Sequence, residues 1–371
     1  NLLKMRNSAN DGWIDLRTLT GGVTSAADAT INSITVGKGA NSVAGNTVLG
    51  EGALDASVSG GNNTAIGKSA LTSHTSGADC VAIGVASLGS NTSASNNTAV
   101  GKDSLATNST GASNTGVGTN ALANSTTSSN NSAFGKDALK LNTTGAENCA
   151  VGTFALDANT TGQLNTALGR GSLSENTTAS NNTAVGYNSL LSNTTGTQNV
   201  AVGTNTLDAN TTGNYNTALG DHVLSENTTA SNNTGVGIYA LLLNTTGTQN
   251  TAVGANSLDA NTTASNNTAL GYASLGANTT GANNVAVGMN SLVNQTTGSQ
   301  NTALGRSALA NNSTASNNTA VGYAALDQNT TGTSNCAVGT NALRDNVTSS
   351  NNTAVGKDAL KLNTASNNTG V

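Results

Sequence analysis

The chain has 371 residues, of which 35% are hydrophobic, 2% are aromatic and 8% are charged, and it contains no proline. So few large apolar side chains argue against a conventional globular core, whereas the low charge and the lack of proline differ from a disordered chain. The net charge of −5, the singly scattered lysines and arginines and the lack of long apolar runs argue against nucleic-acid binding and membrane insertion.

The N-terminal part differs from the rest of the chain. Residues 1–30 carry no repeat, and we expect them to form a separate hairpin element, with candidate strands at residues 2–6 and 13–19 around a loop at residues 7–12. Residues 31–49 are expected to form an irregular first coil, because Gly37 precedes Gly50 by only 13 residues. The first residue is Asn1 rather than methionine, so we expect the sequence to be an excerpt or a processed form.

A repeat of 17 residues runs through the remainder, residues 50–371. Up to Gly356 the pattern Asn-Thr-Ala-Val-Gly recurs without insertion or deletion, and the partial copy after it lacks one residue. Leucine always stands four residues after the repeat glycine, and Val, Ile, Leu or Phe always precedes it. Its 19 glycines are residues 50, 67, 84, 101, 118, 135, 152, 169, 186, 203, 220, 237, 254, 271, 288, 305, 322, 339 and 356. A period this regular predicts that each copy is one step of a stack.

The composition of the repeat favours strands over helices, because Gly, Asn and paired Thr are poor helix formers. We therefore predict an all-β fold, a parallel β-solenoid (β-roll) with one coil per 17 residues. At about 4.8 Å per coil, 18 steps would span about 86 Å. The chain stops partway into another copy at Val371, so we expect further coils or a tip to follow.

Alternation along the strand separates two faces of the coil. Thr and the apolar residue before the glycine share one face, and Asn and Ala share the other. We expect the residue before the glycine and the leucine four after it to fill the interior. The Ala position accepts only small residues beyond the first coil, so we expect it to be the contact between copies in a homotrimer. The residue after the glycine should face solvent, and the asparagines should form amide ladders.

No residues are assigned to catalysis, to a cofactor or to a metal, and we do not expect an enzyme. Residues 61–69 (Gly-Asn-Asn-Thr-Ala-Ile-Gly-Lys-Ser) look like a phosphate-binding loop but are one residue too long, and they are one ordinary copy of the repeat. His74 and His222 are interpreted as solvent-facing substitutions, since no ligand spacing surrounds them.

Three cysteines, Cys80, Cys149 and Cys336, lie several coils apart, which is too far for intrachain disulfides. We interpret all three as small buried replacements for Asn or Thr. Paired threonines such as Thr194 and Thr195 leave an ice-binding solenoid open as an alternative. Adjacent residues of a strand point to opposite faces, so turn and hydrogen-bonding roles are favoured for them.

Residues 182–190 (Asn-Thr-Ala-Val-Gly-Tyr-Asn-Ser-Leu) and 267–275 (Asn-Thr-Ala-Leu-Gly-Tyr-Ala-Ser-Leu) resemble the head repeats of trimeric autotransporter adhesins, which build a left-handed parallel β-roll. They are still more similar to the longer repeats of phage tail fibres. Residues 3–7 (Leu-Lys-Met-Arg-Asn) and 12–16 (Gly-Trp-Ile-Asp-Leu) are similar to a segment of phage fibre and baseplate-appendage proteins.

The resemblance implies a fibre shaft in a virion, a homotrimer that joins tail or baseplate proteins through its N-terminal end and holds a receptor-binding tip away from the particle. The alternative is a bacterial surface adhesin or stalk. Whether Tyr187, Tyr272 or Tyr323 contacts a receptor is open at this point.

Overall fold

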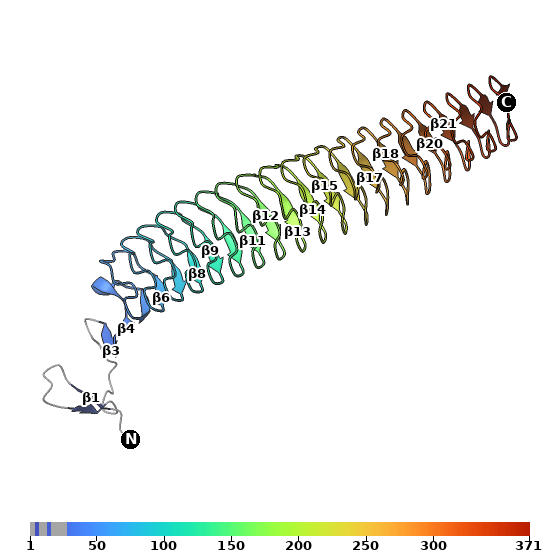
Figure 1. Cartoon of the computed structure of the whole chain (residues 1–371). Helices are drawn as coiled ribbons and strands as arrows, with labels where there is room; N and C mark the ends of the chain where they lie inside the picture. Colours follow the sequence, from blue (N-terminus) through green and yellow to red (C-terminus); the bar gives the residue numbers. More distant parts are fainter. Residues whose placement is uncertain (1–3, 7–12, 16–27) are drawn as a thin grey trace.

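The computed structural model describes residues 4–6, 13–15 and 28–371 and shows an all-β chain (Figure 1). The coils follow one another in chain order along a rod, from the blue N-terminal end to the red C-terminal end. The chain is a parallel β-solenoid, as the period predicts.

Antiparallel pairs precede the stack. Strand β1 (Lys4–Arg6) pairs with β2 (Trp13–Asp15), where the sequence predicts a hairpin, and the predicted loop at residues 7–12 lies outside the described residues. Strand β3 (Ala29–Ile31) pairs with β4 (Ile34–Gly37), so one hairpin spans the boundary predicted between residues 30 and 31. The 3₁₀ turn η2 (Ala40–Ser42) follows, and β4 then pairs with the first strand of the stack.

The stacked strands are short, mostly three residues each. They are β5 (Thr47–Gly50), β6 (Thr64–Ile66), β7 (Val81–Ile83), β8 (Thr98–Val100), β9 (Thr115–Val117), β10 (Ser132–Phe134), β11 (Cys149–Val151), β12 (Thr166–Leu168), β13 (Thr183–Val185), β14 (Val200–Val202), β15 (Thr217–Leu219), β16 (Thr234–Val236), β17 (Thr251–Val253), β18 (Thr268–Leu270), β19 (Val285–Val287), β20 (Thr302–Leu304), β21 (Thr319–Val321), β22 (Cys336–Val338), β23 (Thr353–Val355) and β24 (Thr369–Gly370).

Each strand pairs in parallel with the same strand one coil later, so Ala184 lies beside Ala201. The turns outside the strands also form backbone hydrogen bonds with the next coil. The amide of Leu190 donates to the carbonyl of Thr206 at 3.0 Å, and the amide of Thr194 donates to that of Thr211 at 3.0 Å. Proline would remove one of these donors in any coil, which explains its absence.

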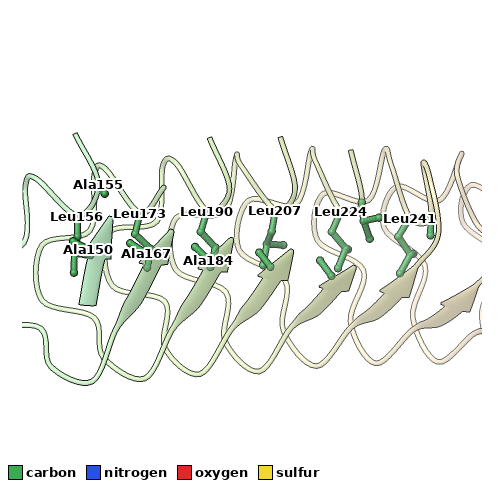
Figure 2. Packing of buried hydrophobic residues seen from close by; sticks show 14 of the residues in the cluster. Ala150, Ala155, Leu156, Ala167, Leu173, Ala184, Leu190, Leu207, Leu224 and Leu241 are labelled. Carbon is green, nitrogen blue, oxygen red and sulfur yellow. The ribbon is translucent and has the colours of Figure 1, made fainter. Parts of the chain in front are cut away.

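The apolar core is a ladder of leucines against a ladder of alanines. Leu156, Leu173, Leu190 and their equivalents stack in one line beside the strand alanines (Figure 2). Leu190 and Ala184 both have 0% exposure. The predicted position of the leucine ladder is confirmed, and so is the outward position of the residue after each glycine, which is buried in none of the coils.

The sequence predicted correctly which residues share a face of the strand, but the assignment of these faces to the inside and the outside was wrong. The Ala face is the interior of the coil rather than a contact between copies, and the small side chain there leaves room for the leucine that packs against it. The residue before the glycine points outward, as the 46% exposure of Leu168 shows. One leucine therefore fills the narrow interior together with small residues and asparagines, and the Ala face no longer supports a trimer.

Two ladders of buried asparagines complete the interior. The sequence predicts the amide ladders but not their position inside the coil. The Asn148 backbone amide donates to Asn131 Oδ1 at 2.9 Å, and Asn159 Nδ2 donates to Asn142 Oδ1 at 2.7 Å. A backbone carbonyl joins the two ladders, because Gly145 O accepts from Asn131 Nδ2 at 3.0 Å and from Asn142 Nδ2 at 2.9 Å. In these coils the buried amides are thus paired along the rod and across it, whereas Asn108 Oδ1 and Asn278 Oδ1 elsewhere in the rod have no partner.

The turns require left-handed backbone at positions that are not glycine. In a single coil Asn188, Leu190 and Gln198 have φ values of 53°, 51° and 58°. Gly186 has a φ of 128°, and a Cβ added there would lie 2.3 Å from the carbonyl oxygen of Gly203. The repeat glycine is therefore fixed both by its backbone conformation and by the closeness of the next coil.

Candidate interaction faces of the rod

The two histidines lie in different environments. His74 takes the place of a ladder asparagine, has 0% exposure and donates from Nε2 to Gly77 O at 2.7 Å, so its interpretation as a solvent-facing residue was wrong. Its Nδ1 has no hydrogen-bond partner, and burial lowers the pKa of His74 because the charged form would lose its solvation. His222 is half-buried, with its Nδ1 3.1 Å from Asp221 Oδ1.

The cysteines are separate and unpaired, but only one of them is buried. Cys80 stands in an asparagine ladder, where its Sγ lies 3.3 Å from Ala94 O and takes the place of an amide donor. Burial raises the pKa of the Cys80 thiol. Cys149 is exposed and Cys336 is half-buried, because the Thr position that they occupy faces outward. The prediction of burial was therefore right for Cys80 and wrong for Cys149, and Cys336 is only partly buried.

The phosphate-loop pattern at residues 61–69 is an ordinary coil. Asn63 and Ala65 are both buried with 0% exposure, so the segment forms part of the interior instead of a cradle. Within the described part of the chain, no group of three or more His, Cys, Asp or Glu side chains could hold a metal ion. Among the described residues, no helix has the length and apolar character that a membrane span requires.

The paired threonines have unequal roles. In Thr194–Thr195 the first hydroxyl donates to the carbonyl of Thr211 at 3.0 Å, and the second side chain is exposed. The same bond recurs between Thr143 Oγ1 and Thr160 O at 2.9 Å. The hydrogen-bonding role favoured by the sequence is confirmed for the first threonine of the pair.

An open cleft of about 560 Å³ lies at the start of the stack, where the β3–β4 hairpin meets the first coil. Asp28 and Asp55 line it together with Gly39 and Leu54. The Asp28 carboxylate already accepts the backbone amides of Lys38 at 2.7 Å and Gly39 at 2.5 Å. This carboxylate therefore holds the turn that leads into the stack.

The residues directly after the repeat glycines form an exposed column of mixed chemistry. Tyr187, Tyr272 and Tyr323 all lie in it with exposures of 45%, 55% and 51%. The guanidinium carbon of Arg170 lies 5.6 Å from the ring centre of Tyr187, and that of Arg306 lies 5.9 Å from Tyr323. Cations thus cover two of the three tyrosines, which leaves Tyr272 as the most exposed ring of this column.

A continuous surface runs along the outer side of the stacked strands. We call it the strand face and define it as the residues three before and one before each of the 19 repeat glycines. The first column holds 13 Thr, three Val, two Cys and one Ser, and the second holds only Val, Leu, Ile and one Phe. No charged residue occupies any position of the strand face, although it is half-buried or exposed throughout.

Sequence reasoning recognised both columns of the strand face but placed them inside the coil. The absence of charged residues from these two positions in every coil indicated that the face excludes charge. It did not reveal that the face points away from the interior of its own coil.

The geometry defines the class of protein as a repeat protein of the parallel β-solenoid type. No protein-family model matches the sequence, and no curated protein is detectably similar to it.

Proposed function

We propose that the chain is the shaft of a fibre, a stiff spacer that holds a receptor-binding element away from the structure that carries it. The observation that carries this proposal is the stack of 17-residue coils, which continues without a break from β5 to β23. The role is mechanical and not catalytic.

The bonding between coils supports a stiff rod. Hydrogen bonds join consecutive coils at the strand, in the turns and through both asparagine ladders. In one coil they include Gly186 N to Leu168 O at 2.8 Å and Asn193 Nδ2 to Asn176 Oδ1 at 3.0 Å. Bending the rod in any direction would stretch one of these rows, so the stack resists bending on all sides.

The proposed setting is a bacteriophage tail fibre or tail appendage, which acts as a homotrimer in host attachment. The N-terminal end would join tail or baseplate proteins, and the receptor-binding tip would lie outside this sequence. The repeats and the segments at residues 3–7 and 12–16 support this setting through their resemblance to phage fibres. A bacterial surface adhesin or stalk is the alternative, because it needs the same stiffness.

The spacer role can be tested by changing the number of coils. Deletion of residues 171–255 removes five whole coils and keeps every ladder in register. We expect a folded fibre shorter by about 24 Å, at about 4.8 Å per coil. Deletion of residues 171–250 ends within a coil and should disrupt the stack. Equal fibre lengths for the wild type and the five-coil deletion, by electron microscopy, would contradict a spacer.

The setting is tested by labelling. Antibodies raised against the purified chain, used in immunogold microscopy, should mark thin projections on the tails of virus particles. Labelling of the bacterial surface would favour the adhesin alternative, and labelling of neither structure would overturn both.

A further inference from the structure

The strand face is too long and too apolar to be explained by the folding of one chain. Phe134, Leu168, Leu270 and Leu304 on it have exposures of 42%, 46%, 47% and 47%. Inside the coil the leucine ladder is already complete, so these side chains add nothing to the core of their own chain. Exposed apolar surface of this extent marks an interaction site in soluble proteins.

We propose that the strand face binds the strand face of other copies of the same chain, with the rods parallel and in register around a common axis. This inference rests on the proposed fibre and names the surface that joins its copies. It also replaces the Ala face as the site of association.

The area of the strand face fits such a contact. A strip about 86 Å long, at about 4.8 Å per coil, and about 10 Å wide, for three residues at about 3.3 Å each, covers about 860 Å². A stable protein interface buries about 800 Å² on each partner, and the largest apolar patch of a monomer is usually about 300–600 Å². The strip, with one apolar column and one column that is mostly Thr, therefore has the area of an interface.

The repeat identifies the partner as a second copy. The strand face presents the same two side-chain columns every 17 residues, at the spacing of parallel strands, from Thr47 to Val355. A partner surface that matches it over its full length needs the same period. The columns beside it, by contrast, contain charged residues such as Lys102 and Arg170, as expected for the rim of an interface.

The side-chain volumes favour a parallel, in-register arrangement. The one aromatic residue of the strand face, Phe134, lies in the same coil as its one serine, Ser132. Symmetry around the rod axis brings the same coil of each copy together at one level. The Phe134 ring of one copy would then lie against the coil of the next copy that carries the small Ser132. An antiparallel pair would place Phe134 against a different coil and lose this compensation.

The first test introduces charge on the strand face of the full-length chain. Leu168→Lys, Val185→Lys and Val202→Lys together place lysines on three consecutive coils at positions that are outward in the single chain. Light scattering at micromolar concentration should show a multimer for the wild type and the mass of one chain for the triple variant. The circular dichroism spectrum should not change, since no interior position is altered.

The matched control carries the same charge on the same coils. Thr178, Thr195 and Thr212 are exposed and lie outside the strand face, so the triple Thr→Lys variant should keep the wild-type mass. A wild-type monomer, or equal dissociation of both triple variants, would overturn the proposal. A monomer that binds ice, detected as thermal hysteresis, would assign the strand face with its column of threonines to ice binding instead.

The second test uses native cysteines as reporters of register. Cys149 and Cys336 both belong to the strand face, 11 coils apart, whereas Cys80 is buried in the interior. A short bismaleimide should join Cys149 of one copy to Cys149 of another, and Cys149→Ser should abolish this product. Absence of the product in a multimer, or a Cys149–Cys336 product between copies, would overturn the parallel, in-register arrangement.

The two proposals fail separately. A single chain that is nevertheless found in virus or cell-surface projections would leave the fibre intact and remove the strand-face contact. A multimer with the predicted cross-link that is absent from such projections would keep the strand-face contact and overturn the fibre proposal.

Discussion

Asparagine ladders should contribute a large share of the local stability of the rod, and Asn193→Ala tests this contribution. Asn193 has 0% exposure, and its Nδ2 donates to Asn176 Oδ1 at 3.0 Å and to Gly196 O at 2.9 Å. Its Oδ1 accepts from Asn210 Nδ2 at 2.9 Å. The substitution removes three buried hydrogen bonds.

The expected cost follows from these partners. Three bonds at about 1 kcal/mol each give about 3 kcal/mol, and an unpaired buried oxygen adds to this. Asn176 Oδ1 would become such an oxygen, because Asn193 is its donor. Gly196 O would still accept the hydrogen bond from Asn182 Nδ2 at 2.9 Å. The loss of stability should therefore be limited to adjacent coils.

Hydrogen exchange with mass spectrometry is the suitable assay, because the stability of a repeat protein varies along the chain. Amides of the coils around Asn193 should exchange about 100-fold faster than in the wild type, at about 1.4 kcal/mol for each factor of ten. The exposed Thr195 in the same coil provides the control, since Thr195→Ala should change exchange little. Equal protection in the two variants would refute the ladder as a source of stability.

Further predictions concern other positions of the coil. Leu190→Asp should destabilise the stack by several kcal/mol because it buries an unpaired carboxylate, whereas Tyr187→Asp on the outside should be nearly neutral, and equal melting temperatures would contradict the assigned faces. Gly186→Ala should cost about 2 kcal/mol or more in chemical denaturation, because φ is 128° and the added Cβ meets the next coil, while Gly276→Ala, without a positive φ, serves as its control. Burial lowers the pKa of His74 in the folded chain, so as the pH falls the unfolded chain takes up a proton on this histidine before the folded chain does. The free energy of unfolding, measured by urea denaturation, should therefore decrease as the pH drops below about 6.5, the ordinary pKa of histidine. His74→Asn should remove this pH dependence.

The repeat of the sequence was enough to predict the period, the parallel stack, the leucine ladder and the amide ladders. Each depends on spacing alone, and spacing is visible in the sequence. Alternation in the strand showed that Ala184 and Val185 face opposite sides, but not which of them faces inward. The interior is so narrow that Leu190 leaves room only for alanine, a fact that depends on the cross-section of the coil.

The turn geometry was beyond sequence reasoning for a different reason. Leucine has no preference for left-handed backbone, yet Leu190 adopts a φ of 51° in order to point into the core. Burial and the hydrogen bonds of neighbouring coils compensate for this local cost. His74 lies seven residues after Gly67, at a position that holds asparagine in most coils, and it was misplaced because the spacing does not show that this column is buried.

We propose that this chain forms a stiff rod of 17-residue coils that associates through its strand face. Cryo-electron microscopy of the full-length chain can examine both parts of this proposal at once. The predicted map shows parallel solenoids around one axis, with about 4.8 Å between coils, leucines inside each coil and the strand faces toward the axis. A map with another coil period, or with the strand faces toward solvent, would contradict it.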